Sequence, residues 1–93
     1  MIIGACELKL LIYGSNSLKD KRQVIKSILG RIKSRFNVSI AEVDLNGSWQ
    51  TAIIGFSCVS NNTKHSHQIL TNVIKFIEED SRVEIIEKKI EIL

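Results

Sequence analysis

The sequence predicts an α+β domain in which two helices cover one face of a four-stranded antiparallel sheet. Two stretches, around residues 18–36 and 63–80, carry apolar residues at helical spacing. Four further stretches have the two-residue alternation or the composition of strands. Their order is β-α-β-β-α-β, which is the split βαβ or ferredoxin-like plan. With 93 residues, the chain is expected to form a single domain, residues 1–93.

The first strand is expected from Ile2 to Tyr13, because apolar residues alternate there with Glu7 and Lys9. The following Gly14-Ser15-Asn16 is typical of a turn. Ser17 is a favourable N-cap, and an acid three residues on gives a start that resembles a capping box. The first helix is then expected to run to about Phe36.

The later elements are bounded by turn and cap residues. Asn46-Gly47 predicts a hairpin turn between two strands. The alternation near the C-terminus changes phase at Ile85-Ile86, which predicts a bulge or a break. The expected elements are strands at 38–45 and 49–59, a helix at 63–80 and a strand at 83–92.

The composition predicts a cytoplasmic protein. Hydrophobic residues make up 44% of the chain and charged residues 25%, which is ordinary for a globular protein. No apolar run approaches the roughly 20 residues that cross a bilayer, and no targeting segment is recognisable. Cys6 and Cys58 lie in apolar strands and are interpreted as buried thiols, with a disulfide as the alternative if those strands are neighbours.

Positive charge is concentrated in the first helix. Residues 17–36 hold seven cations and one acid (+6), whereas the rest of the chain holds six cations and nine acids (−3). Cations at a helix start oppose the macrodipole, so folding alone does not explain them. The candidate RNA- or phosphate-binding residues are Lys19, Lys21, Arg22, Lys26 and Lys33.

Four of these cations form a stripe along one flank of the apolar face. Lys21 instead falls within the apolar arc, where it could extend its amine to the sheet edge. A line of cations suits an RNA backbone better than one small anion. The alternatives are a solvated basic face without a ligand and a protein partner with an acidic surface.

The sheet face opposite the helices has many apolar candidate positions, which predicts a homodimer joined through that face. The alternative is a face that binds another protein or nucleic acid, with Tyr13 and Trp49 as stacking platforms for bases. The predicted interface residues are Leu11, Tyr13, Val38, Ile40, Trp49, Ile53 and Val59.

Three blocks of the chain, residues 17–22, 36–43 and Trp49-Gln50, resemble the signature blocks of the YlxP-like family. Its members are short bacterial proteins that are classed as a domain of unknown function. The resemblance implies a ferredoxin-like fold, a cytoplasmic bacterial protein and no established activity. Members are often encoded beside translation and ribosome-assembly genes, so the resemblance also favours RNA or a ribosomal particle as the partner.

No catalytic, cofactor or metal site is expected. Acylphosphatases share this fold and bind phosphate in the turn after the first strand, but the corresponding turn here, residues 13–17, lacks their arginine. His65 and His67 diverge on a helix and cannot chelate one metal as an i, i+4 pair can. The sequence therefore favours a non-enzymatic binder of RNA or a ribosomal particle. A protein-interaction or regulatory module and an acylphosphatase-like hydrolase are the alternatives.

Overall fold

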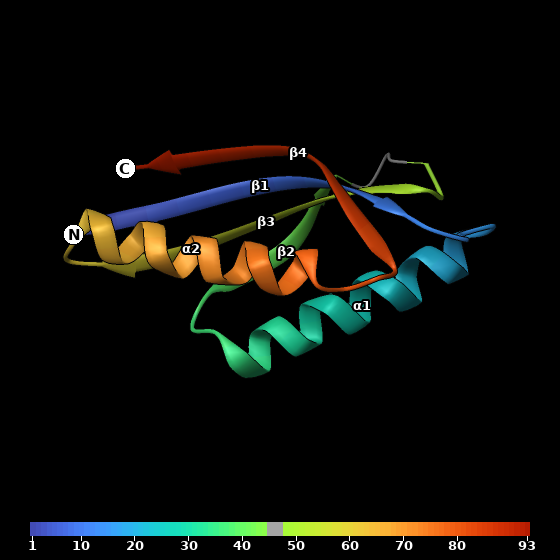
Figure 1. Cartoon of the computed structure of the whole chain (residues 1–93), viewed down its shortest axis with the longest axis horizontal. Helices are drawn as coiled ribbons and strands as arrows, with labels where there is room; N and C mark the ends of the chain where they lie inside the picture. Colours follow the sequence, from blue (N-terminus) through green and yellow to red (C-terminus); the bar gives the residue numbers. More distant parts are fainter. Residues whose placement is uncertain (45–47) are drawn as a thin grey trace.

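A computed structural model describes residues 1–44 and 48–93. The chain forms the predicted ferredoxin-like β-α-β-β-α-β fold (Figure 1). The predicted Asn46-Gly47 turn and Leu45 lie outside the described residues. The elements are β1 (Ile2–Ile12), α1 (Leu18–Arg35), β2 (Ser39–Asp44), β3 (Thr51–Ser60), α2 (Thr63–Glu78) and β4 (Val83–Ile92).

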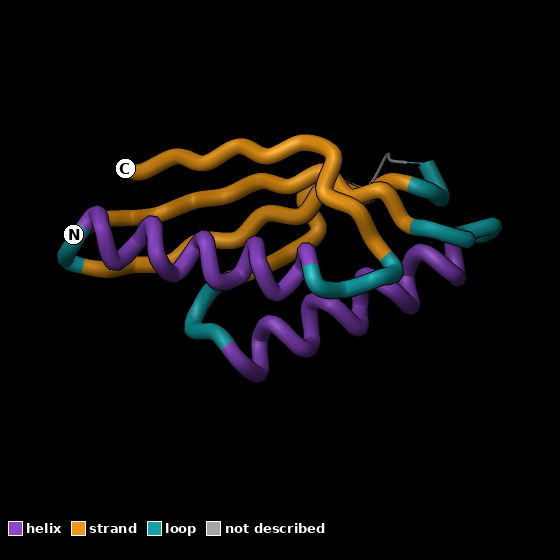
Figure 2. Tube along the Cα trace, viewed as in Figure 1, coloured by secondary structure: helices purple, strands orange, loops and turns teal. Residues whose placement is uncertain are grey.

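The four strands form one antiparallel sheet in the order β2-β3-β1-β4. Both helices lie on the same side of this sheet, and its other side is uncovered (Figure 2). The predicted irregularity in β4 is confirmed. Lys9 pairs with Glu87 and Leu10 pairs with Ile85, so Ile86 is an extra residue that β1 does not match.

The hydrophobic core lies between the sheet and the two helices. The even-numbered residues of β1 and β3 point into it because side chains alternate along a strand. Cys6 and Cys58 face this core from neighbouring strands, and both are buried free thiols. Burial raises the pKa of the Cys6 thiol to about 11. The largest fully buried side chains include Leu8, Leu10, Ile28, Ile32, Ile54, Leu70 and Ile77.

The predicted N-cap is confirmed, whereas the acid at position 20 bonds one residue earlier than in a capping box. Ser17 is the N-cap of α1, and its Oγ accepts the backbone N–H of Asp20 at 3.1 Å. The Asp20 carboxylate accepts the backbone N–H of Asn16, also at 3.1 Å. The one acid of this helix is therefore used in its cap and leaves the cations further along α1 without an acidic neighbour on the helix.

Arg82, at the entry to β4, ties that strand to α1. Its Nε and Nη2 donate to the two carboxylate oxygens of Asp80 at 2.9 and 2.7 Å. Nη2 also donates to Ser27 Oγ at 3.2 Å. These guanidinium hydrogen bonds hold the pKa of Asp80 below its ordinary value and raise that of Arg82.

The side on which β2 places its apolar residues differs from the prediction. Ile40 pairs with Phe56, and both point toward the helices, with Ile40 only 6% exposed. Val38 packs against the same core. Their assignment to the open face was therefore wrong. Apolar residues stand at both phases of this short strand, and its register against β3 decides which ones are buried.

Candidate nucleic-acid interface

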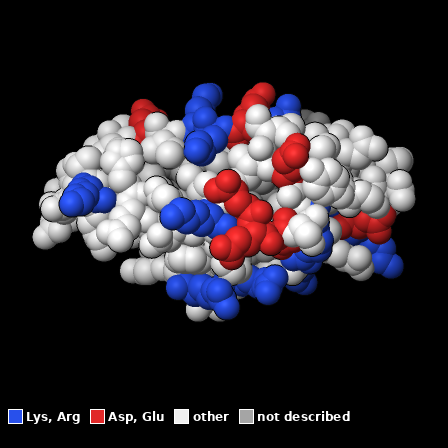
Figure 3. Space-filling model, in the orientation of Figure 1, with Lys and Arg blue, Asp and Glu red and all other residues white. Residues whose placement is uncertain are grey.

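Four cations line one exposed flank of α1. We call Lys19, Arg22, Lys26 and Lys33 the α1 cation surface, and all four are exposed. They lie beside the side of the helix that packs into the core. Figure 3 shows basic side chains along the lower edge of the molecule, where α1 lies, and acidic side chains nearer the middle of the view. The predicted stripe thus lies on exposed residues of α1, and Asp20, the one acid of this helix, is engaged in its cap.

Lys21 lies apart from this surface. Only 3% of the residue is exposed, and its Nζ donates to the backbone oxygen of Ser48 at 3.1 Å. The same Nζ lies 3.5 Å from a carboxylate oxygen of Glu42. Lys21 therefore joins the first turn of α1 to β2 and to the segment before β3. In this position its amine is used within the fold and is not presented to a phosphate.

Two further cations of α1 turn toward α2. Arg31 and Arg35 lie with their guanidinium carbons 5.8 and 5.1 Å from the centre of the Phe76 ring. Phe36 packs edge-on against the same ring at 5.7 Å. Sequence analysis did not single out these arginines, although their i, i+4 spacing places them on one side of α1. They extend the positive charge of α1 while they cover an aromatic side chain.

The turn between β1 and α1 is fixed by its own hydrogen bonds. Gly14 has a φ of 69°, a conformation that favours glycine. Ser15 is buried, and its Oγ lies 2.6 Å from the backbone oxygen of Trp49 and 3.3 Å from that of Ser17. This turn occupies the place where an acylphosphatase holds phosphate, and here its serine hydroxyl binds the chain itself.

Other candidate chemistry is dispersed. His65 and His67 are both exposed at the start of α2. Within residues 1–44 and 48–93, no three His, Cys, Asp or Glu side chains are grouped as a metal would need. In the same residues, neither helix is long and apolar enough to cross a membrane.

The open sheet face combines apolar, small and charged side chains. Tyr13 is 52% exposed and Val59 65%, and Trp49, before β3, is 56% exposed. Leu11 and Ile53 are half-buried. The Tyr13 hydroxyl donates to Glu84 at 3.0 Å, and this hydrogen bond raises the pKa of Tyr13.

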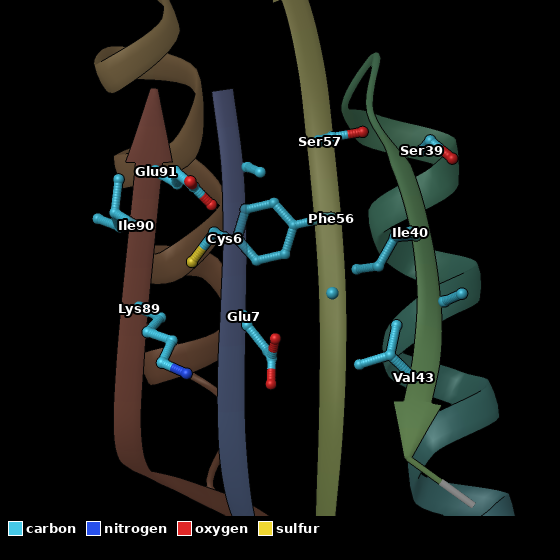
Figure 4. A pocket seen from close by; sticks show the side chains of 13 residues that line it. Cys6, Glu7, Ser39, Ile40, Val43, Phe56, Ser57, Lys89, Ile90 and Glu91 are labelled. Atoms are coloured by element: carbon cyan, nitrogen blue, oxygen red, sulfur yellow. The ribbon is translucent and has the colours of Figure 1, made fainter. Parts of the chain in front are cut away.

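A hollow of about 610 Å³ crosses this face, and Figure 4 looks onto it with the helices behind the sheet. It exists because Ala5, Ala41 and Ser57 carry small side chains. Gly55 carries none, and the Val43 side chain lies against it, with Cγ1 3.1 Å from where a Cβ at position 55 would stand.

A family described as "Protein of unknown function (DUF503)" matches residues 3–90. The chain belongs to this family. The uncharacterized protein YlxP of Bacillus subtilis (strain 168) is 37% identical over 83 residues, which cover 89% of this chain and 90% of the relative. The resemblance to the YlxP-like family is thereby confirmed, including its bacterial origin and the lack of an assigned function.

Solved structures with similar folds include the de novo designed protein LFR1 1, which has a ferredoxin fold. Its TM-score is 0.55 at 15% identity, over 98% of this chain and 86% of that chain. A dimeric ferredoxin-like protein from an uncultured marine organism gives a TM-score of 0.53 at 6% identity, over 100% of this chain and 96% of that chain. At such identities the likeness shows the fold alone.

Proposed function

We propose that this protein is a non-catalytic RNA-binding protein of the bacterial cytoplasm, and that the α1 cation surface binds the phosphate backbone of RNA or of a ribosomal particle. The observation that carries the proposal is the charge of residues 17–36, seven cations and one acid, with that acid engaged in the helix cap. The free thiols of Cys6 and Cys58 suit a reducing compartment.

The shape of the α1 cation surface suits a polyanion. From Lys19 to Lys33, a helix advances about 20 Å, so the charges follow a line and do not surround a point. A phosphate backbone presents a line of negative charge that cations can contact without reading bases. Binding of this kind orients an RNA and does not require a catalytic group.

An acidic protein is a weaker candidate for the same surface. Protein interfaces draw most of their binding energy from a few buried aromatic or apolar anchors. Of the exposed residues between and beside the cations, Gln23, Gly30 and Ser34 offer no such anchor, and Leu18, which is 44% exposed, is a single apolar side chain at the start of the helix. A backbone-binding surface needs none, because its affinity comes from charge and counterion release.

The direct test measures RNA affinity by fluorescence anisotropy with a labelled single-stranded RNA. We expect Lys26→Glu/Lys33→Glu to weaken binding at least about tenfold, because two phosphate contacts become repulsive. The matched control is Lys64→Glu/Lys75→Glu, which reverses two exposed cations of α2. Both pairs change the net charge from +3 to −1, so equal losses in both variants would contradict a site on α1.

A second test identifies the natural partner. Wild-type protein and an Lys19→Glu/Arg22→Glu/Lys26→Glu variant are used to capture material from a bacterial lysate, with and without ribonuclease. Lys21 is left unchanged because it is buried in the fold. Ribosomal RNA lost both with the variant and after ribonuclease supports the proposal. An acidic protein that is retained after ribonuclease and lost with the variant would support the rival function.

We also propose that the protein is a homodimer joined through the open sheet face. Exposed apolar side chains such as Tyr13 and Val59 support this, because a second copy would remove them from water. The dimeric state of the structural neighbour from the marine organism is a further support. Light scattering at micromolar concentration should give twice the mass of the chain, whereas the mass of one chain would contradict the dimer.

A further inference from the structure

We infer that two copies stack their open faces about a two-fold axis that crosses the strands between the levels of Glu7 and Lys9. This inference rests on the proposed homodimer and specifies which residues meet in it. It follows from three features of the open face: the order of its charges, the place of its small residues and the side of the sheet on which α1 lies.

The charges at the centre of the face alternate both along and across the strands. On β1, Glu7 pairs with Lys89 of β4, and two residues further Lys9 pairs with Glu87. All four positions belong to the open face, since the intervening Leu8 is fully buried in the core. At one position the acid is on β1 and the base on β4, and two residues further the base is on β1 and the acid on β4.

We call residues that pair across neighbouring strands one level of the sheet. A two-fold axis across the strands places the level of Glu7 in one copy over the level of Lys9 in the other. Glu7 then faces Lys9 of the partner subunit, and Lys9 faces the partner's Glu7. At the same levels on β4, Lys89 faces the partner's Glu87. The centre of the face is therefore complementary to itself in charge, which is what a two-fold interface requires.

The same axis also matches large side chains with small ones. On β3, Ile53 is level with Lys9 and Gly55 is level with Glu7. Ile53 therefore lies over the partner's Gly55, in the hollow of about 610 Å³. One level further out, Leu11 lies over the partner's Ala5. Stacked sheets pack when the side chains of their two faces interdigitate in this way.

The ends of the face are matched as well. Tyr13 stands beyond Leu11 at one end, and Ile3 pairs with Val59 at the other end. The axis brings each exposed end over the opposite end of the second copy. The match is closest near the axis, because twisted sheets stack with their strands about 30° apart.

Two other two-fold arrangements fit less well. An axis along the strands between β1 and β3 places Glu7 over Gly55 and Lys9 over Ile53, so charges are buried without partners. An axis between β1 and β4 pairs the charges but moves the apolar residues of β3 beyond the contact. The axis across the strands pairs the four central charges and keeps the apolar residues of β3 in the contact. At its margin, on β4, Glu84 faces the partner's Glu91.

In this dimer, the two α1 cation surfaces remain accessible. Both helices lie on the face of the sheet opposite the interface, so stacking the open faces turns each α1 outward (Figure 1). The dimer would therefore present two separate basic surfaces on opposite sides, which could hold two RNA segments.

The test uses two variants, Glu7→Lys and Lys9→Glu, studied separately and mixed by sedimentation equilibrium or native mass spectrometry. In a dimer of one variant alone, positions 7 and 9 of the two chains carry the same charge and face each other. We therefore expect the dimer dissociation constant of each variant to rise at least about tenfold. When the variants are mixed, lysine at position 7 of one chain faces glutamate at position 9 of the other. We expect heterodimers with close to the wild-type dissociation constant.

Each other outcome contradicts a different part of the proposal. If the wild-type protein is monomeric, both the homodimer and this axis are contradicted. Variants that each remain as dimeric as wild type place the interface elsewhere. If the variants are weakened and do not recover on mixing, the axis across the strands is contradicted. That result would instead fit an axis between β1 and β4. There, lysine at position 7 faces the partner's Lys89 and glutamate at position 9 faces the partner's Glu87, so like charges remain in the mixture. RNA affinity, which depends on α1, should be unchanged throughout.

If a variant does not fold, as judged by circular dichroism, single Glu7→Cys and Lys9→Cys variants are mixed instead. The axis places the two introduced thiols opposite each other only in the heterodimer, whereas the native Cys6 and Cys58 are buried. Because stacked sheets lie about 10 Å apart, which is too far for a direct disulfide, a short thiol-specific crosslinker should give a covalent dimer on a non-reducing gel. A chain that stays monomeric on the gel, while wild type is dimeric in solution, would contradict the axis.

Discussion

The outer side of α1 and the open face of the sheet are both exposed, but they carry charge in different ways. On α1, the cations from Arg22 to Lys33 stand without acids between them. On the sheet, acids and bases alternate, with Glu7 beside Lys89 and Lys9 beside Glu87. The first pattern needs a negative partner, whereas the second can be satisfied by a copy of itself.

This difference shows that the arrangement of charge says more about a partner than the amount of exposed surface does. The α1 cation surface has one exposed apolar neighbour, Leu18, and suits a backbone that is bound through charge. The open face has a hollow and exposed apolar side chains, which suit close packing. If the two surfaces take different partners, each should be alterable without affecting the other.

The largest expected effect is on RNA binding. Reversing all four charges of the α1 cation surface to glutamate should weaken RNA affinity about 100-fold or more, because each lost phosphate contact is charge-assisted. The dimer dissociation constant of the same variant should stay within about twofold of wild type, as seen by sedimentation equilibrium. If the variant also dimerised more weakly, RNA binding and dimerisation would be coupled, which would contradict the independence of the two surfaces.

The second effect separates two lysines of one helical turn. Lys21→Met should lower the free energy of unfolding by about 1–3 kcal/mol, because the Ser48 carbonyl and Glu42 lose their partner. Lys19→Met should change it by less than about 0.5 kcal/mol, since Lys19 is exposed. Urea denaturation measures both values. Similar values for the two variants would contradict the division between an anchoring and a binding lysine.

The third effect tests whether α1 and the sheet are held as one unit. Arg82→Ala should lower the free energy of unfolding by about 1 kcal/mol at neutral pH, because it removes the hydrogen bonds to Asp80 and Ser27. Measured as a urea midpoint, the loss should appear without a change in RNA affinity.

The same pair gives a pH dependence with a defined sign. Because the folded state lowers the pKa of Asp80, its stabilisation is fully present above the unfolded carboxyl pKa of about 3.9. It is lost as the pH falls through the lower folded value. The difference in stability between wild type and Arg82→Ala should therefore shrink below about pH 4. A difference that grows on acidification would contradict the assigned ion pair.

The smallest effect concerns the covered side of the sheet. Burial raises the pKa of Cys6 to about 11, so little reactive thiolate is present in the folded protein at pH 8. Modification of this thiol by iodoacetamide should be slow until urea unfolds the chain. Rapid modification in the native state would place Cys6 on an accessible surface.

The fold could be predicted because its local signals agree with one another. Alternation located the strands, helical spacing located α1 and α2, and Ser17 with Asp20 marked the start of α1. The phase change at Ile85-Ile86 also located the irregularity in β4. These signals depend on residues that are close together in the sequence.

The errors concern contacts between distant residues. Ile40 was placed on the open face, although pairing with Phe56 turns it into the core. The position of Lys21 on the helix was recognised, but its partners Glu42 and Ser48 come from another part of the chain. The hollow could not be predicted either, because it depends on which small residues of four strands stand side by side.

The most direct test of the α1 cation surface is the dependence of RNA affinity on salt. Each phosphate contact to single-stranded RNA should contribute about −0.7 to the slope of log K against log salt. Four contacts therefore predict a slope of about −3 for the wild type and about −1.5 for Lys26→Glu/Lys33→Glu. A slope near zero in the wild type, or one that Lys26→Glu/Lys33→Glu leaves unchanged, would contradict RNA binding through α1.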